Sequence, residues 1–515
     1  MIRTADELGA GLAPARESRP IRPGERIHVL GIAGAGASAA ALHARAQGAI
    51  VTGCDPGGPS PYTPALAAAR IPIEWAHHPA HVGVVPPPDR LAVTKALTAV
   101  APDHPELLAA RAAGIVLEPW QQVVAAAAYG RELLAVAGIP GKSTTAGWLT
   151  WILTEAGLEP SAFVGALLPA ALTGLVPATA RIGNGEPFVV EADEYAGNFD
   201  SYLPRIALVT TIEWDHPDVF EDRAAVIEAF RRWLDRVPDA TVIANLDDPG
   251  VVELLGDLQA RSSRSGTIVG VSLGAPDSAA GDGPQAPDLW LDRRLTGRVV
   301  ERTPDGTALD VDGLDASTHR VNLPAVGDHN AANALVALAG AVTVAPSSED
   351  PGRLLWGLAT YPGIGRRLER KGEARGVVVY DDYGHHPSAI RATLAALRQR
   401  EPGRRVWAVY EPLTFHRTAA MLEEFADALV GADAVVVAAI WASRDTDMSV
   451  TSPEALAAAV RGRKPGIPVA APGSVEETAA WLAGEVREGD AVLVMGGGRS
   501  YRIAELLLEA LAADR

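Results

Sequence analysis

One glycine-rich loop, placed between a predicted strand and a predicted helix, constrains the fold of this chain most. Residues 132–137 are an apolar run of strand length, the loop Gly-Ile-Pro-Gly-Lys-Ser-Thr-Thr follows at 138–145, and an apolar helix is predicted over 146–157. The glycines leave backbone N–H groups free to surround a phosphate, Lys142 adds a positive charge, and Ser143 offers a hydroxyl group to Mg²⁺. The pattern predicts a phosphate-binding loop in a parallel α/β sheet, with an inert turn as the alternative.

A second glycine-rich loop follows an earlier predicted strand. The apolar run 27–30 ends at Gly31, an Ala/Leu-rich helix comes next, and a second strand over 49–54 is followed by Asp55. This βαβ layout is typical of dinucleotide-binding folds, in which glycines let the backbone approach a pyrophosphate and a terminal carboxylate bonds a hydroxyl group or base edge. The spacing departs from G-x-G-x-x-G, so a turn that serves packing alone remains possible.

Carboxylates and a histidine follow two further predicted strands. One strand, over residues 187–190, ends in Glu-Ala-Asp-Glu, and another, over 206–212, ends in Glu-Trp-Asp-His at 213–216. The carboxyl ends of parallel strands are where open α/β sheets bind ligands. Hard oxygen donors beside a phosphate loop favour Mg²⁺, although any one of them could be a solvated strand end.

The last third of the chain carries polar clusters of its own. Gly-Asp-His-Asn at 327–330 precedes an Ala/Leu helix and predicts either a helix cap or a nucleotide contact. A strand over 376–380 runs into Asp-Asp-Tyr-Gly-His-His-Pro, a combination that packing does not explain. Strands and helices alternate to the end of the chain, which predicts doubly wound sheets throughout. The Gly/Pro-rich segment 262–316 is predicted to be loop and short strand.

Length and composition set outer limits. At 515 residues the chain has room for about three domains. Its formal charge of −18 disfavours binding to nucleic acid or to an anionic membrane. Cys54 is the single cysteine, which excludes a disulfide framework and a cysteine-built zinc site. Without a signal-like start or a membrane-length apolar run, we expect a cytoplasmic protein, monomeric or homodimeric, that does not insert into membranes.

Taken in order, seven short motifs resemble those of the Mur ligases of peptidoglycan synthesis. They are Gly-x-x-Gly-x-Gly-x-Ser, Gly-x-x-Gly-Lys-Ser-Thr-Thr, Glu-Ala-Asp-Glu-Tyr, Glu-Trp-Asp-His, Gly-Asp-His-Asn-x-x-Asn-Ala, Arg-Arg-Leu-Glu and Asp-Asp-Tyr-Gly-His-His-Pro. The resemblance covers about residues 26–510 and is greatest to the UDP-N-acetylmuramate branch, which comprises the L-alanine ligase and the murein tripeptide recycling ligase. It implies a leader over 1–24, a Rossmann-like UDP-sugar-binding domain over 25–131, a central P-loop ATPase domain with a mostly parallel sheet over 132–345, and a Rossmann-like amino-acid-binding domain over 346–515.

The resemblance also implies an activity and its residues. The activity is an ATP- and Mg²⁺-dependent amide ligation that joins L-alanine to the carboxylate of UDP-N-acetylmuramate through an acyl phosphate. Carried over by position, the implied ATP contacts are Gly138, Gly141, Lys142, Ser143, Thr144, Asn330, Asp382 and Tyr383, and the implied Mg²⁺ ligands are Ser143, Glu191 and His216. The implied catalytic residues are Lys142, Glu191, His216, Arg367 and His386, with Arg367 reaching the γ-phosphate from the third domain. The implied substrate contacts are Gly34, Gly36, Ser38 and Asp55 for the UDP-sugar, and His386 and Arg417 for the amine and its carboxylate.

Departures from the family pattern keep alternatives open. Ile139 and Pro140 replace the usual Thr-His or Thr-Asn of the phosphate loop, and Pro140 removes one N–H donor. Leu413 and Thr414 replace the His-Arg expected in the alanine ligase. The tripeptide of murein recycling is therefore the alternative amine, and a degenerate nucleotide-binding paralogue without ligase activity is a second alternative. A nicotinamide dehydrogenase would explain the first glycine loop but would leave the phosphate loop unexplained.

Overall fold

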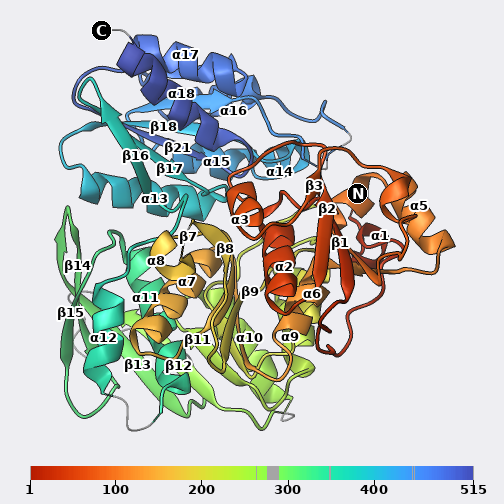
Figure 1. Cartoon of the computed structure of the whole chain (residues 1–515). Coiled ribbons are helices and arrows are strands. Elements are labelled where there is room, and N and C mark those ends of the chain that lie inside the picture. Colours follow the sequence, from red (N-terminus) through yellow and green to blue (C-terminus); the bar gives the residue numbers. More distant parts are fainter. Residues whose placement is uncertain are drawn as a thin grey trace.

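Three α/β domains follow one another along the chain (Figure 1). The computed structural model describes residues 2–174, 176–261, 264–274, 289–346, 350–443, 445 and 447–513. The N-terminal domain, drawn in red and orange, and the C-terminal domain, drawn in blue, both adjoin the yellow and green central domain. The predicted fold class, three α/β domains with largely parallel sheets, is confirmed.

The N-terminal domain contains a parallel five-stranded sheet of order β3-β2-β1-β4-β5. Its strands are β1 Arg26–Leu30, β2 Ile50–Cys54, β3 Ile73–Glu74, β4 Arg90–Val93 and β5 Val116–Pro119, and its helices are α2 Ala35–Ala46, α3 Thr63–Ala68, η1 Pro79–His81, α4 Lys95–Val100, α5 Pro105–Ala112 and α6 Trp120–Ala127. Five alanines of α2 are buried, and this helix packs against β7 and β8 of the central domain as well as against its own sheet. Small side chains therefore join the first two domains.

The predicted leader is part of the folded structure. It contains a short helix, α1 Ala5–Leu8, capped by Thr4 and Glu7. Leu8 has no exposed surface and packs with Tyr195 and Ala196 of the central domain. The Thr98 hydroxyl group donates a 2.5 Å hydrogen bond to the Leu8 carbonyl oxygen. The leader thus lies across the first two domains.

The central domain is built on ten strands in the order β15-β14-β13-β12-β11-β10-β6-β9-β7-β8. The strands are β6 Glu132–Ala137, β7 Ser161–Leu168, β8 Ala178–Arg181, β9 Pro187–Glu191, β10 Ile206–Val209, β11 Thr241–Asn245, β12 Ile268–Gly274, β13 Arg293–Thr303, β14 Gly306–Asp312 and β15 His319–Leu323. The helices are α7 Lys142–Glu155, α8 Ala170–Thr173, η2 Tyr195–Ser201, α9 Arg223–Asp235, α10 Pro249–Ala260, α11 Asp328–Val344 and α12 Pro351–Ala359. Strands β6, β9 and β10 are adjacent and parallel, so the loops that follow them meet at one edge.

Two sequence expectations for the central domain need correction. The segment 262–316 is more regular than predicted, because β13 and β14 form a long antiparallel pair within it; its residues 262–263 and 275–288 lie outside the described residues. The expected domain boundary at 345 falls before α12, which packs on α7 of the central domain. The indole of Trp148 donates to the Leu358 carbonyl oxygen, and Leu354 and Leu358 belong to the central core.

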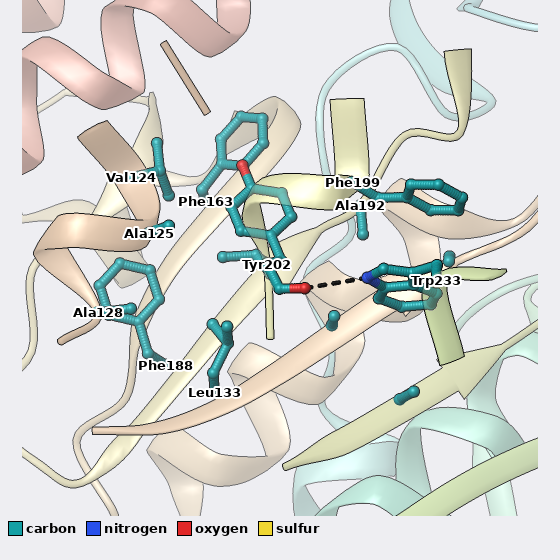
Figure 2. Packing of buried hydrophobic residues seen from close by; sticks show 14 of the residues in the cluster. Val124, Ala125, Ala128, Leu133, Phe163, Phe188, Ala192, Phe199, Tyr202 and Trp233 are labelled. Carbon is teal, nitrogen blue, oxygen red and sulfur yellow. Dashed lines mark hydrogen bonds between the residues drawn. The ribbon is translucent and has the colours of Figure 1, made fainter. Parts of the chain in front are cut away.

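One hydrophobic core runs through the first two domains. Figure 2 shows Val124 and Ala125 of α6 and Ala128, which follows this helix, beside Phe163 and Phe188 of the central sheet. Farther along, Phe199 stacks on Trp233 at 4.8 Å, and the Trp233 indole donates a 3.0 Å hydrogen bond to the Tyr202 carbonyl oxygen, drawn as a dashed line in Figure 2. Burial of aromatic side chains across this boundary makes the two domains one hydrophobic body.

The C-terminal domain has a six-stranded sheet of order β16-β17-β21-β18-β19-β20, parallel except for β16. Its strands are β16 Glu369–Ala374, β17 Val377–Asp382, β18 Arg405–Glu411, β19 Ala434–Ala438, β20 Val469–Gly473 and β21 Asp490–Gly496. Its helices are α13 Pro387–Arg400, α14 Phe415–Ala420, α15 Leu422–Leu429, α16 Pro453–Arg463, α17 Val475–Glu485 and α18 Ser500–Ala513. Its core is separate from the core of the other two domains. Within the described residues, no helix has the length and apolar character that a membrane crossing requires.

Candidate active site

A cavity of about 580 Å³ lies where the three domains meet. The N-terminal domain contributes Gly36 and Trp120 to its wall. The central domain contributes the phosphate loop, the segments at the ends of β9 and β10, and the start of α11. The C-terminal domain contributes the segment before β16 and the turn after β17. Twelve of its lining residues belong to the set predicted from the sequence: Gly36, Gly141, Lys142, Ser143, Thr144, Glu191, His216, Asn330, Arg367, Asp382, Tyr383 and His386.

The phosphate loop has the geometry that its sequence predicts. Gly138 and Gly141 adopt φ values of +134° and +108°, which glycine accommodates easily. A Cβ atom at Gly138 would lie 2.2 Å from the Thr210 hydroxyl oxygen, so a side chain is excluded there. The hydroxyl groups of Thr210 and Thr211 both donate to the Pro140 carbonyl oxygen, at 2.8 and 2.7 Å. Helix α7 begins at Lys142, so its N-terminus faces the cavity and favours an anion.

Lys142 is held by a carboxylate that was not among the site residues predicted from the sequence. Its ammonium nitrogen donates to Glu194 Oε2 at 2.8 Å, and Asp193 lies 3.8 Å away. Glu194 is 1% exposed. Burial favours the neutral form of each partner, but the mutual attraction outweighs it: the pKa of Lys142 is raised and that of Glu194 is lowered. Both groups are therefore charged at neutral pH.

A group of candidate metal ligands lies beside this ion pair. Potential ligand atoms of Asp193, Glu194 and His216 all lie within 4.8 Å of one another. Glu194 Oε1 is buried, has no hydrogen-bond partner among the described residues, and lies 3.5 Å from His216 Nε2. Two carboxylates and an imidazole beside a phosphate loop fit Mg²⁺, which takes a few protein oxygens and completes its shell with phosphate and water.

The other two predicted Mg²⁺ ligands form a second pair. The Ser143 hydroxyl group donates to Glu191 Oε1 at 3.0 Å, and the Gly165 N–H donates to Glu191 Oε2 at 2.7 Å. Arg367 of the C-terminal domain donates to the same Ser143 oxygen at 2.7 Å. The arginine predicted to reach the γ-phosphate therefore touches the phosphate loop from across the cavity.

Tyr383 lies between two arginines. The guanidinium carbons of Arg366 and Arg367 each lie 5.0 Å from the centre of its ring, and Arg366 also packs on Tyr501. Arg366 is itself fixed by Asp381, whose carboxylate it contacts at 3.1 Å. Cation–π contacts of this kind hold the two guanidinium groups in place, and Arg367 lines the cavity.

Asp382 and Asn330, the predicted ATP contacts from two different domains, have partners within the protein. Both Asp382 oxygens accept backbone hydrogen bonds, from Leu368 N–H at 2.7 Å and Gly384 N–H at 2.6 Å, and burial raises the pKa of the group. These contacts assign Asp382 to holding two loops together. The Asn330 amide donates to the Val326 carbonyl oxygen at 2.8 Å. Beside it, burial lowers the pKa of His329 to about 4, which keeps that imidazole neutral.

His386 and Arg417 both reach across from the C-terminal domain to the end of β10. His386 Nε2 lies 3.0 Å from the Trp214 carbonyl oxygen, and Arg417 donates to Asp215 Oδ2 at 2.7 Å. Burial alone would raise the pKa of Asp215, but the Arg417 guanidinium and nearby imidazoles hold it well below its usual range. Arg417, predicted as a substrate contact, is buried at this junction, with 3% exposed surface.

Arg417 has capacity for a further acceptor. Its Nε and Nη1 atoms are buried and have no hydrogen-bond partner among the described residues. A buried guanidinium with two unused donors is costly unless an acceptor binds. A carboxylate oxygen is an acceptor that either of these N–H groups can bind in a charge-assisted hydrogen bond.

The four predicted UDP-sugar residues have different surroundings. Gly34 is exposed in the glycine loop, and Asp55 accepts a 3.1 Å hydrogen bond from the Ala33 N–H of the same loop. Gly36 is needed for packing, because a Cβ atom there would lie 2.2 Å from the Trp120 ring. Ser38 has no exposed surface and its hydroxyl group bonds Ala35 and Thr179, so the predicted substrate contact of Ser38 is replaced by a contact between domains.

Strained backbone surrounds the cavity, a feature that the sequence did not indicate. Four non-glycine residues near it have positive φ: His216 at +57°, Arg366 at +57°, Leu368 at +47° and Thr414 at +60°. Such conformations cost on the order of 1–3 kcal/mol each and cluster at functional sites. Along with Glu194, His329 and Trp120, these residues complete the site. The acidic run at 191–194 was a usable signal for Glu194, and His329 stands in the Gly-Asp-His-Asn motif, while no local pattern marks Trp120.

Comparison with known families agrees with this arrangement. Three family models match successive parts of the chain: the Mur ligase family catalytic domain at residues 26–131, the Mur ligase middle domain at 136–341, and the Mur ligase glutamate ligase domain at 366–498. Together they match most of the chain and follow its three domains.

Similar proteins share nearly the full length. A UDP-N-acetylmuramate--L-alanine ligase of Kineococcus radiotolerans is 38% identical over 492 residues, covering 95% of this chain and 96% of the relative. A ligase of the same name from Frankia casuarinae is 36% identical and covers 95% of this chain and 98% of the relative.

Solved structures share the fold. A UDP-N-acetylmuramate-alanine ligase of Thermotoga maritima is 22% identical with a TM-score of 0.74, covering 95% of this chain and 100% of that one. A murein peptide ligase of Psychrobacter arcticus is 25% identical with a TM-score of 0.69, covering 95% and 99%. Motifs, domain order and near-complete relatives agree: the chain belongs to the Mur ligase family.

Proposed function

We propose that this protein is an ATP-dependent, ADP-forming ligase that joins L-alanine to the carboxylate of UDP-N-acetylmuramate. The observation that supports this most is the cavity shared by three domains, with a phosphate loop and an acidic metal-ligand group on its wall, and a buried arginine with unused donors that bonds Asp215 of that wall. Full-length relatives that carry this activity in their names favour L-alanine over a tripeptide.

The reaction proceeds in two balanced steps. The UDP-sugar carboxylate attacks the γ-phosphorus of ATP, which forms an acyl phosphate and releases ADP. The amine of L-alanine then attacks the acyl carbon, phosphate leaves, and the amine loses a proton. Phosphoryl transfer leaves a protein mainly the tasks of positioning and charge stabilisation.

The residues divide these tasks between the domains. The α7 N-terminus and Lys142 bind phosphate oxygens, and Arg367 adds positive charge from the opposite wall. Asp193, Glu194 and His216 would hold Mg²⁺, which when bound neutralises phosphate charge. When a phosphate group replaces Glu194 as the partner of Lys142, the Glu194 carboxylate would become available to bind the cation. The glycine loop of the N-terminal domain, with Asp55 behind it, binds the UDP part.

The amine substrate is assigned to the Arg417 guanidinium. Each of its two unused donors could bond an oxygen of the carboxylate of a free amino acid, and its Asp215 contact keeps it in place at the loop after β10. His386, the N-cap of α13, lies at the same junction and would contact the amine side.

A phosphate-release assay tests the proposal. The purified protein is mixed with ATP, Mg²⁺ and UDP-N-acetylmuramate, and amines are compared: L-alanine, glycine, L-serine and the murein tripeptide. We expect phosphate release with L-alanine only when all substrates are present. Release with the tripeptide and not with L-alanine would transfer the assignment to the recycling ligase, and no release with any amine would support a non-catalytic paralogue.

A further inference from the structure

A second cluster of metal-ligating side chains lies in the N-terminal domain, outside the cavity. It contains His28, the single cysteine Cys54, His81 and Glu106, and potential ligand atoms of all four lie within 4.8 Å of one another. Cys54 and Glu106 have no exposed surface and His28 is 3% exposed. Polar side chains are rare in a protein core, so a buried carboxylate, a thiol and two imidazoles that converge on one point are an unusual arrangement.

The spacing of these atoms suits tetrahedral coordination. In a tetrahedral zinc site with ligand distances of 2.0–2.3 Å, neighbouring ligand atoms lie about 3.3–3.8 Å apart. His28 Nε2 lies 3.3 Å from Glu106 Oε1 and 3.4 Å from Cys54 Sγ, and Cys54 Sγ lies 3.5 Å from Glu106. His81 Nδ1 lies closer, 2.7 Å from Glu106 Oε1, so this pair would separate slightly around an ion.

Neighbouring polar side chains orient these ligands, as the residues that bond metal ligands do in known metal sites. His28 Nδ1 lies 2.8 Å from the Thr52 hydroxyl oxygen, which fixes the ring with Nε2 facing the cluster. His77 Nδ1 lies 3.1 Å from Cys54 Sγ and 3.4 Å from Glu106 Oε2, on the outer side of the cluster. His77 is therefore a third imidazole beside the cluster, placed to bond Cys54 and Glu106.

The charges also balance. One thiolate and one carboxylate carry two negative charges, and two neutral imidazoles add none, so a divalent cation makes the buried group neutral. Binding displaces the thiol proton of Cys54 to solvent. Four protein ligands leave no open position, which is the arrangement of structural and not of catalytic zinc.

The four ligands come from four different segments of the chain. His28 is on β1, Cys54 ends β2, His81 ends η1, and Glu106 is in the first turn of α5. Strand β3 has two residues, and between it and β4 the chain contains no regular element other than η1. An ion would fasten this stretch to the sheet. It would also fix the end of β2, from which Asp55 bonds the glycine loop.

We propose that His28, Cys54, His81 and Glu106 form a structural zinc site in the N-terminal domain. It differs from the cysteine-built site that one cysteine excludes, because imidazole and carboxylate supply three of the four ligands. The site is independent of the proposed ligase activity.

Cobalt spectroscopy tests the site directly. Untagged full-length protein is stripped with a chelator and titrated with Co²⁺. Because Cys54 is the only cysteine, any thiolate-to-cobalt charge-transfer absorption reports this residue alone. We expect that absorption, tetrahedral d–d bands in the visible range, and displacement of both by Zn²⁺. Cobalt binding without a thiolate band, or no binding, would overturn the proposal.

Zinc content and stability give a second readout. Metal analysis of untagged protein dialysed against Zn²⁺ and then against buffer should find about one tightly held zinc per chain, and zinc should raise the melting temperature of stripped protein. Cys54→Ser and His81→Ala should lose the tight zinc. His78→Ala is the matched control, because His78 is an exposed neighbour outside the cluster. His216→Ala removes the separate candidate group at the active site and should keep the tight zinc. Equal zinc retention by Cys54→Ser would also overturn the site.

Discussion

At the residue scale, the contact between Lys142 and Glu194 changes what the phosphate-loop lysine does. Sequence reasoning treats this lysine as exposed and serving a ligand alone. The structure pairs it with a carboxylate that is 1% exposed. Removing one partner of a buried pair leaves an uncompensated charge, which is more costly than removing both.

We therefore predict that Lys142→Met loses ligase activity and also lowers stability, by about 3 kcal/mol. The double variant Lys142→Met/Glu194→Gln should recover most of the stability and none of the activity. Thermal unfolding and phosphate release measure the two effects. A single variant as stable as the wild type would show that Glu194 is not held as a charged partner.

A second prediction concerns Arg417. Arg417→Lys keeps the charge but loses the planar pair of donors that fits a carboxylate. We expect the KM for L-alanine to rise by roughly tenfold or more and the KM for ATP to stay nearly constant. Arg398→Lys is the control, since Arg398 pairs with Asp433 at the surface of the same domain. An unchanged KM for L-alanine would remove Arg417 from the amine site.

At the scale of elements, helix α2 joins the first two domains. Its alanines pack closely, Ser38 bonds Thr179, and His43 Nε2 donates to the Ala162 carbonyl oxygen of β7 at 2.9 Å. Burial lowers the pKa of His43 to about 4, partly opposed by this hydrogen bond. The folded state therefore favours the neutral form of the His43 imidazole.

This gives a pH dependence with a defined sign. The pKa of His43 in the folded state lies below its value near 6.5 in the unfolded chain, so the folded state binds fewer protons. Stability from this group is complete above pH 6.5 and is lost as the pH falls toward 4, by about 3 kcal/mol. His43→Gln should reduce the fall in unfolding free energy across this range. Parallel curves for wild type and His43→Gln would contradict the assignment.

The difference between what the sequence predicts and what it does not is also clearest at the scale of helices, strands and loops. The phosphate loop was predictable because strand, loop and helix are adjacent in the chain, and the glycines carry a local conformational signal. A motif records residue types but neither burial nor the partners of Ser38 and Asp382, which lie 141 and 14 residues away. Helix α12 was assigned to the wrong side of a boundary because its apolar face gives no indication of which domain it packs on.

At the scale of the whole molecule, the interfaces differ in kind. The N-terminal and central domains share one hydrophobic core. The C-terminal domain meets them largely through polar contacts around the cavity, among them Arg367 with Ser143, His386 with the Trp214 carbonyl and Arg417 with Asp215. Interfaces of this polar kind are compatible with relative domain motion.

We predict that Arg367→Ala weakens the docking of the C-terminal domain as well as the chemistry. Small-angle scattering without nucleotide should show a larger radius of gyration, and kcat should fall by roughly a hundredfold or more, as expected when charge stabilisation is removed from a transition state. Arg370→Ala is the control, because Arg370 lies on β16 and pairs with Glu373 at the surface. Identical scattering curves for wild type and Arg367→Ala would show that this contact does not hold the domain.

The Arg367–Ser143 hydrogen bond has a thermodynamic consequence for inhibition. With the nucleotide bound at this loop, as proposed, the nucleotide and the docked domain would change each other's affinity by the same factor. A compound that binds the C-terminal domain and holds it away from the loop would therefore weaken nucleotide binding without occupying the nucleotide's place. Its apparent competition with ATP would level off at a finite limit, whereas a compound bound in the cavity would compete without limit.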